Sequence, residues 1–269
     1  MEFKEIIFTE EEGIGTLVLN RPENRNVITS LEMVAEIETV CRHVNEGSSF
    51  RVLIITAKDP AFSAGGNIKD MAAKKGMFEG SPVQVMENYR RFVQRIPRAV
   101  HGVEIPTIAA VNGPAVGAGC DLALMCDMRI ASDRAVFGET FLNVGLIPGD
   151  GGSYFLSRIV GMAKACELTF TGDMVGADEA FRVGLVNCVV PHEQLMEKSL
   201  ELANKIASKP AQALRMAKRL LYMGARVALP DLLEQAASFQ ALCHNTCDHQ
   251  EALSAFFENE KRNPLFKGA

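Results

Sequence analysis

The stretch Val111–Asp127, VNGPAVGAGCDLALMCD, constrains the fold of this chain more than any other. It follows Glu104–Val111, a short β-branched apolar run whose composition predicts a buried strand. Glycines and a proline then allow a tight turn, and CDLALMCD has the composition of a helix with buried sides. The chain is therefore predicted to pass from strand through loop to helix within a few residues.

The start of that helix is a candidate site for a negative ligand atom. Its first backbone N–H groups have no partners inside the helix, and the helix dipole adds partial positive charge there. A ligand oxygen that becomes negative would be held at this end. Asp121 follows within one turn as a candidate acid or base. The alternative is a Gly-rich turn that only packs a helix closely on a sheet.

A second loop of similar composition, Ala61–Asp70 (AFSAGGNIKD), follows the buried strand predicted for Arg51–Ala57. It also offers small residues with approachable amides. Two such loops, each after a buried strand of one core, could direct two amides at one oxygen. That arrangement is an oxyanion hole, suited to a thioester carbonyl that turns into an enolate.

The composition describes an ordinary globular chain. It has 269 residues, of which 48% are hydrophobic and 23% charged, enough for one large domain with an appendage. A net charge of -5 without a Lys/Arg run argues against nucleic-acid binding, and the apolar runs are shorter than the ~20 residues of a membrane span. The seven cysteines are scattered in apolar segments, and we do not expect the acidic start to act as a signal peptide. We therefore expect reduced thiols and a cytoplasmic protein.

The predicted strands lie in the first two thirds of the chain and mostly alternate with helices, which predicts an α/β core in layers. The order of the strands in the sheet stays open. Ser30 is the expected N-cap of a helix that runs to about Asn45. We also expect irregular and mobile loops over residues 58–82, and one helix over Val83–Gly102. From His192 onward the chain is predicted to be helical, with breaks at its prolines.

Five motifs, in this order along the chain, resemble the crotonase (enoyl-CoA hydratase/isomerase) superfamily: AFSAGGNIKDM, NGPAVGAGCDLALMCDMRIAS, LIPGDGGS, ADEAFRVGLVNCVVP and AFFENEKRNPLFKG. The likeness covers nearly the whole chain, from NRPENRNVIT to the terminus. It implies an α/β core that is a spiral of ββα units over residues 1–191. It also implies a C-terminal helical region, residues 192–269, that forms homotrimers, commonly stacked as homohexamers.

The resemblance implies an acyl-CoA substrate, with coenzyme A as part of the substrate and no metal or other prosthetic group. The thioester oxygen would lie between the backbone amides of Gly66 and Ala118. Phe256 would assist from a neighbouring subunit. The other positions expected to bind the substrate are Arg25, Ala64, Gly65, Asn67, Ile68 and Phe141.

This chain departs from the family pattern in its acid–base residues. Typical hydratases carry two glutamates that hold a water molecule and exchange protons with it. The first position is Asp121, one methylene shorter, and the second is Phe141, which cannot transfer a proton. The aspartates of dienoyl isomerases fall on Asn143 and Gly149, and Asp150 lies one residue further. The remaining candidates for proton transfer are Asp121, Glu139 and Asp150.

Each candidate has a purely structural alternative. Asp121 could only cap or pair inside the core, Glu139 could be solvated, and Asp150 could be the N-cap of the helix after it. Cys120 is expected to be a buried thiol and not a nucleophile. Packing is favoured over zinc binding for the helical cluster Cys243, His244, Cys247 and His249.

The function predicted from these residues is that of an enoyl-CoA hydratase/isomerase-type enzyme, which forms an enolate of an acyl-CoA thioester. Asp121 would move a proton, assisted by water, Asp150 or Glu139, and an apolar pocket would raise the pKa of its carboxyl group. Because Phe141 replaces the second glutamate, a double-bond isomerase or a hydrolase/lyase on an acyl-CoA is the alternative. A non-catalytic acyl-CoA-binding protein is the alternative from another class.

Overall fold

The computed structural model describes residues 2–257 and 262–268. Its core is a six-stranded sheet with the order β1-β2-β3-β4-β6-β9, in which β1 and β2 form an antiparallel hairpin and the other neighbours are parallel. A second sheet has the order β5-β7-β8. The strands are β1 (Ile6–Glu11), β2 (Ile14–Leu19), β3 (Val52–Ala57), β4 (Thr107–Val111), β5 (Ala115–Val116), β6 (Met128–Ser132), β7 (Val136–Gly138), β8 (Met174–Gly176) and β9 (Cys188–Val190).

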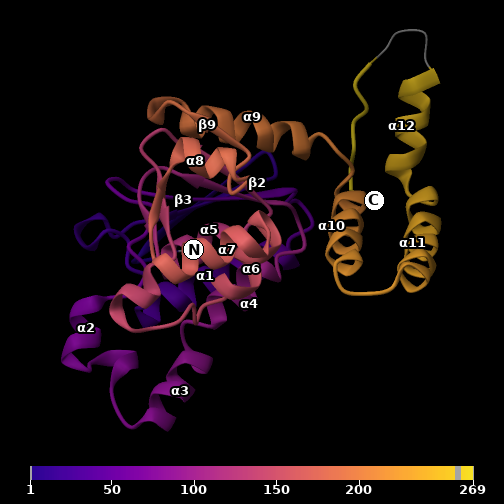
Figure 1. Ribbon diagram of the computed structural model, residues 1–269. Coiled ribbons are helices and arrows are strands. Elements are labelled where there is room, and N and C mark those ends of the chain that lie inside the picture. Colours follow the sequence, from indigo (N-terminus) through magenta and orange to yellow (C-terminus); the bar gives the residue numbers. More distant parts are fainter. Residues whose placement is uncertain (1, 258–261, 269) are drawn as a thin grey trace.

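Helices cover both faces of the six-stranded sheet. In Figure 1, α9 (Leu195–Ala207) lies above the sheet, and α1 (Leu31–Glu46), α4 (Arg95–His101) and α5 (Ala118–Met125) lie below it. Leu195 and Ala203 of α9 are buried against residues of β3, β4 and β6 in a small second core. Helix α9 therefore belongs to the layered core, although it follows residue 191.

The predicted N-cap of the first helix is confirmed, because the Ser30 hydroxyl accepts the Met33 amide at the start of α1. The prediction of one helix over Val83–Gly102 is wrong. The chain forms α3 (Pro82–Arg91) and then α4, because Phe92 has non-helical angles (φ −117, ψ −94). This break lets Val93 and Ile96 reach the core. The segment over residues 58–82, expected to be irregular, also contains α2 (Ile68–Ala73) and the short helix η2 (Gly76–Phe78).

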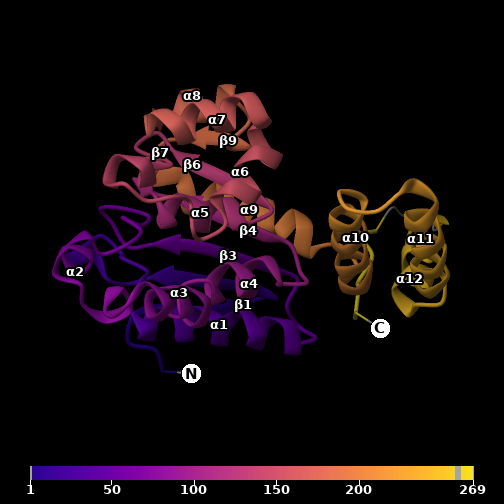
Figure 2. The ribbon, with the colours of Figure 1, turned by 60° about the horizontal axis from the view of Figure 1, so that its bottom comes forward.

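The last three helices extend beyond the core. Helices α10 (Ala211–Gly224), α11 (Leu229–His244) and α12 (Cys247–Phe257) form an arm beside the core in both ribbon views (Figures 1 and 2). Helix α10 is tied to the core by the hydrogen bond from Lys218 Nζ to the Ile105 carbonyl (2.9 Å). The predicted breaks lie at Pro210, before α10, and in the turn before α11. The remaining helices are η1 (Pro22–Asn24), η3 (Thr140–Val144), α6 (Gly152–Val160), α7 (Met162–Thr171), α8 (Ala177–Arg182) and η4 (His192–Gln194).

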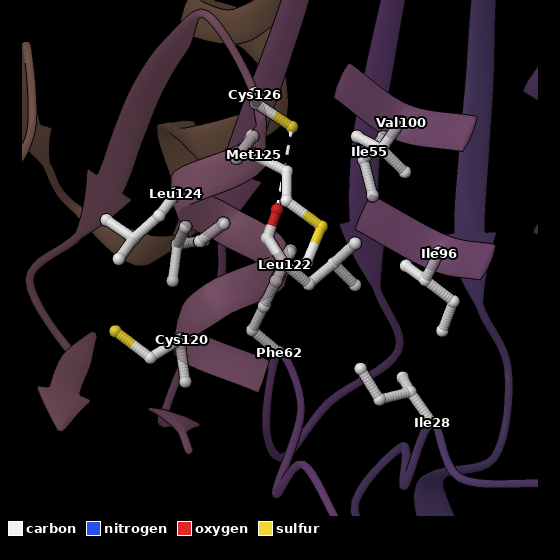
Figure 3. Packing of buried hydrophobic residues seen from close by; sticks show 14 of the residues in the cluster. Ile28, Ile55, Phe62, Ile96, Val100, Cys120, Leu122, Leu124, Met125 and Cys126 are labelled. Carbon is white, nitrogen blue, oxygen red and sulfur yellow. Dashed lines mark hydrogen bonds between the residues drawn. The ribbon is translucent and has the colours of Figure 1, made fainter. Parts of the chain in front are cut away.

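The hydrophobic core fixes α5, all of whose residues are buried. Figure 3 shows Leu122 and Met125 of α5 pointing toward Ile55 of β3 and toward Ile96 and Val100 of α4. Burial of α5 on all sides explains why its sequence is apolar around the whole helix. All seven cysteines are free thiols. In the residues that the structure describes, no helix is long and apolar enough to cross a bilayer.

Candidate active site

Two loops meet where the neighbouring strands β3 and β4 end. Because these strands are parallel, their carboxyl ends lie at the same edge of the sheet. The Ser63 amide donates to the carbonyl of Pro114 (3.1 Å), and the Val116 amide donates to the carbonyl of Ser63 (3.0 Å). The loop after β3 and the loop after β4 are therefore held side by side.

Two glycines allow this close approach. Gly65 has a φ of +76, and a β-carbon on it would lie 2.5 Å from the carbonyl oxygen of Val116. A β-carbon on Gly119 would overlap the carbonyl oxygen of Ser63. Any side chain at either position would push the two loops apart, which gives a physical reason for glycine in both motifs.

The amides of Gly66 and Ala118, the predicted oxyanion donors, lie in these two loops. Gly117, with φ 54 and ψ −124, turns the chain into α5, so that Ala118 is the first helical residue. The first hydrogen bond along α5 is donated by the Asp121 amide to the Gly117 carbonyl (3.0 Å). Across residues 2–257 and 262–268, neither predicted donor gives its amide hydrogen to a protein acceptor. Both hydrogens are therefore available to a ligand.

Three carboxyl side chains gather beside the start of α5. Asp121 lies in its first turn. Glu139 follows β7, which pairs with β5, and the Gly117 amide donates to the Gly138 carbonyl next to it (2.8 Å). Asp150 lies just before α6, which packs on α5. Their exposed fractions are 0% for Asp121, 2% for Glu139 and 5% for Asp150, so all three carboxyl groups lie in the protein interior.

These carboxyl groups lack the partners that buried charges normally have. In the described part of the chain, no donor reaches either oxygen of Asp121, either oxygen of Glu139 or Oδ1 of Asp150. A β-carbon on Gly152 would overlap Oδ1 of Asp121 and lie 2.8 Å from Oε2 of Glu139. The two carboxyl groups therefore face the same side of Gly152. A shared proton satisfies such a pair, since two bare charges at this depth would be very costly.

Burial is the largest cause of a raised pKa for all three groups. Burial raises the pKa of Asp121 well above its ordinary value, and the negative charge of Glu139 adds to this effect. Burial also raises the pKa of Glu139. For Asp150, burial and then the charge of Glu139 raise the pKa to about 6. The cluster therefore offers groups that can hold or release a proton near neutral pH.

The structural alternatives for two of these residues are wrong. Glu139 is buried and not solvated, because the pairing of β7 with β5 draws it into the interior. Asp150 does not cap α6, because the N-cap residue is Gly151 and no side chain caps that helix. The expected burial of Cys120 is confirmed, and burial raises the pKa of its thiol well above the ordinary value. This thiol is therefore not poised to act as a thiolate.

Two residues at this site were not singled out from the sequence. Tyr89 of α3 lies opposite the loop before α6, where a β-carbon on Gly149 would be 3.3 Å from its ring. Burial and the charge of Asp150 raise the pKa of Tyr89. Gly152 is the second, because its missing side chain leaves room for two carboxyl groups. The run GDGG hinted at a tight loop, but a tyrosine in a helix carries no such signal.

Comparison with known proteins decides the family. The family model described as enoyl-CoA hydratase/isomerase matches residues 9–269. The chain belongs to this family.

The similarity to individual members extends over complete chains. The crotonyl-CoA hydratase of Syntrophomonas wolfei is 36% identical over 99% of this chain and 100% of its own length. The 2,3-dehydroadipyl-CoA hydratase of Escherichia coli is 34% identical over 98% of this chain and 99% of its own length. The crystal structure of an enoyl-CoA hydratase from Bacillus anthracis superposes with a TM-score of 0.91 at 35% identity, covering 99% of this chain and all of that one.

These similarities confirm the predicted crotonase-type α/β fold with its C-terminal helical region. They also confirm an enzyme of the enoyl-CoA hydratase/isomerase type that acts on an acyl-CoA.

The residues expected to bind the substrate in this enoyl-CoA hydratase/isomerase-family chain surround the two loops. The Arg25 carbonyl accepts the Ala64 amide (2.9 Å), which ties the turn after η1 to the first loop. Asn67 is the N-cap of α2, and Ile68 begins this helix with 63% of its surface exposed. The ring of Phe141 lies 3.7 Å from where a β-carbon on Gly117 would be. An apolar ring therefore stands beside the turn that leads into α5.

Phe256 and the predicted Cys/His cluster both lie on the C-terminal arm, beside the core. Phe256 of α12 is 78% exposed and stacks edge-on against Phe257. His244 Nδ1 and His249 Nε2 are 3.1 Å apart, and Cys243 Sγ lies 3.6 Å from Met216 Sδ. No metal-type group of three His, Cys, Asp or Glu side chains occurs among the described residues.

Proposed function

We propose that this enzyme converts an acyl-CoA into its thioester enolate. The carbonyl oxygen would accept hydrogen bonds from the amides of Gly66 and Ala118. The observation that carries the proposal is the cluster of three partnerless, buried carboxyl groups beside the start of α5. The amides would stabilise the negative charge on the oxygen, and the carboxyl cluster would move the proton at the carbon next to the thioester.

The three carboxyl groups would divide this work. Asp121 and Glu139 face one side of Gly152 and would share one proton, so that this pair holds an acid at neutral pH. Burial and the charge of Glu139 raise the pKa of Asp150 to about 6. Only its Oδ1 is a fully buried oxygen without a partner, and Oδ2 is not. Asp150 would therefore be ionised above that pH, with one oxygen accessible to accept a proton. An acid and a base would then stand on one side of the two amides.

Hydration of a 2-enoyl-CoA is the reaction that this arrangement supports best. A water molecule loses a proton to the base, its oxygen bonds to C3, and the acid delivers a proton to C2 of the enolate. Relatives named crotonyl-CoA hydratase and 2,3-dehydroadipyl-CoA hydratase favour this reaction. The test is to incubate the enzyme with enoyl-, dienoyl- and 3-hydroxyacyl-CoAs and to follow ultraviolet absorbance and mass. Addition of one water to an enoyl-CoA is expected, and unchanged substrates across the panel would contradict the proposal.

Double-bond isomerisation is the second candidate, and Phe141 favours it. An isomerase needs to move a proton between two carbons and does not need to hold a water molecule. The ring of Phe141 beside Gly117 is apolar and cannot hold that water by a hydrogen bond. Phe141→Glu separates the two reactions: hydration is expected to rise if the missing carboxylate limits it. Unchanged hydration with lower isomerisation would instead favour the isomerase.

We also propose that the arm α10–α12 assembles the chain into trimers or stacked trimers. The arm carries large apolar side chains that are exposed in the single chain. These are Leu221, Leu229, Leu233, Leu242, Phe256 and Phe257. Burial of such surplus apolar surface between subunits supports the proposal. Phe256 would then lie near the acyl-CoA of a neighbouring subunit.

A further inference from the structure

His192 connects the bases of the two loops that carry the proposed oxyanion amides. It begins η4, after the last strand of the sheet. Its Nδ1 lies 3.0 Å from the carbonyl oxygen of Asn112, and its Nε2 lies 3.1 Å from Oδ2 of Asp59. Asn112 directly follows β4, and Asp59 follows β3 by two residues. One imidazole ring therefore spans the edge of the sheet where both loops begin.

The partners of this ring decide where its hydrogens must be. The Asn112 carbonyl can only accept, and it also accepts the Ser132 hydroxyl (2.9 Å), so Nδ1 of His192 carries a hydrogen. Oδ1 of Asp59 accepts from the Asn112 side-chain amide (2.9 Å). Although burial opposes the effect, hydrogen bonds from Asn112 and His192 hold the pKa of Asp59 below its ordinary value. Asp59 is therefore a carboxylate, and its two oxygens face the Asn112 side chain and Nε2 of His192.

The surroundings of the ring contain both signs of charge. The main-chain amide of His192 donates to Oδ1 of Asp133 (3.1 Å), which lies just after β6. The charge of Arg134, also after β6, acts on Asp59. The side chain of His192 is 18% exposed, whereas that of Asp59 is 61% exposed. An ion pair as exposed as this contributes little to global stability, so its effect should be local.

We propose that His192 is a positioning residue that sets the spacing of the two oxyanion loops. Beyond the ring, the same loops are joined by the Ser63 and Val116 hydrogen bonds. The ring together with the Asn112–Asp59 hydrogen bond at the base, and these bonds further along, thus fix the loops at two points before they reach Gly66 and Ala118. Because a small misplacement of oxyanion donors lowers the rate strongly, loss of the ring should slow the chemical step more than it weakens substrate binding. This inference rests on the proposed function.

The test compares three substitutions that remove one or both of the bonds. His192→Asn keeps a donor near the position of Nδ1, His192→Gln keeps one near Nε2, and His192→Ala keeps neither. We expect His192→Ala to lower kcat on the substrate identified above about tenfold, with KM within about twofold of the parent. The Asn and Gln variants should lie between Ala and the parent. Glu193→Gln, an exposed change next to the ring, is the matched control and should match the parent.

Backbone amide hydrogen exchange is a second measurement, and it does not depend on catalytic activity. In His192→Ala, the segments 58–66 and 112–118 should exchange about tenfold faster, with other core segments unchanged. Asp59→Asn, at an exposed position, should also make these segments exchange faster. It replaces His192→Ala in the test if that variant does not fold. Parent-like kcat and parent-like exchange in folded variants would overturn the inference. Faster exchange in His192→Ala, together with a parent protein that turns over no acyl-CoA, would support the positioning role and refute the proposed function.

Discussion

The carboxyl groups of Asp121 and Glu139 face the same side of Gly152, although they come from α5 and from the segment after β7. Both are buried, and no donor within the described residues reaches any of their four oxygens. A pair in this setting is best satisfied by one shared proton, as in other buried carboxyl dyads. Glu139 thus belongs to a buried carboxyl cluster with Asp121, although its sequence position gave no sign of this neighbour.

The first prediction concerns the space beside Gly152. In Gly152→Ala, the new β-carbon would overlap Oδ1 of Asp121 and crowd Glu139, so the pair must move. We expect a loss of about 1–3 kcal/mol in the free energy of unfolding and at least a tenfold lower kcat. Chemical denaturation and steady-state kinetics measure the two effects. Gly176→Ala, where a β-carbon meets nothing within 4 Å, is the control and should change neither quantity.

The second prediction concerns proton transfer by Asp121. Asp121→Asn keeps the size of the side chain but removes its exchangeable acid. We expect kcat to fall by about 10²-fold or more, while the affinity for acyl-CoA changes little. Stopped assays of turnover and equilibrium binding of a saturated acyl-CoA report the two quantities. Asp178→Asn on the exposed start of α8 is the matched control. A parent-like rate for Asp121→Asn would indicate that Asp150 or Glu139 transfers the proton instead.

The third prediction concerns pH and Asp150. If Asp150 is the base, kcat should rise with pH around a midpoint near 6, and Asp150→Asn should lose this rise.

The same pKa has the opposite effect on stability. The folded protein holds the proton up to about pH 6, whereas the unfolded chain releases it near 3.8, so stability falls as pH rises through this interval. Asp150→Asn should therefore be more stable than the parent above pH 6, by up to about 3 kcal/mol, and equal near pH 4. Identical pH profiles of parent and variant would contradict both effects.

The fourth prediction distinguishes two roles of Gly66: its amide hydrogen could bind the substrate oxygen, or its missing side chain could leave necessary space. Gly66→Pro removes the amide hydrogen, and we expect kcat to fall by about 10²-fold or more in a folded protein. Gly66→Ala keeps the hydrogen. Its β-carbon would overlap only the end of the flexible Met71 side chain, which can move, so most activity should remain. Equal activity of the two variants, both folded, would show that the amide of Gly66 is not a donor to the substrate.

The fifth prediction concerns the arm. Light scattering of the full chain should give the mass of a trimer or hexamer at micromolar concentration. A chain that ends at Ala228, without α11 and α12, should dissociate or precipitate and lose acyl-CoA binding, because the apolar side chains of the arm would lack their neighbours. Phe256→Ala in the full chain should weaken binding while the assembly remains. A stable monomer of the full chain would refute the proposed assembly.

Local sequence patterns predicted several elements correctly because their causes are local. The Ser30 cap and the passage from β4 through a Gly turn into α5 depend on residues within one turn of each other. The helix over Val83–Gly102 was wrong because the break at Phe92 serves the packing of Val93 and Ile96, which no local pattern reports. The solvated alternative for Glu139 was wrong for a similar reason, because a glutamate in a loop gives no sign that a neighbouring strand will bury it.

The sequence by itself determined the family, the two amide-presenting loops and the absence of a glutamate at Phe141, because these are properties of contiguous motifs in a fixed order. Only the tertiary structure decided which carboxyl groups meet. Asp121, Glu139 and Asp150 come together because β7 pairs with β5 and α6 packs on α5. His192 reaches residues 80 and 133 positions away for the same kind of reason. Contacts over such separations arise when the sheet and its covering helices assemble, so no stretch of sequence contains them.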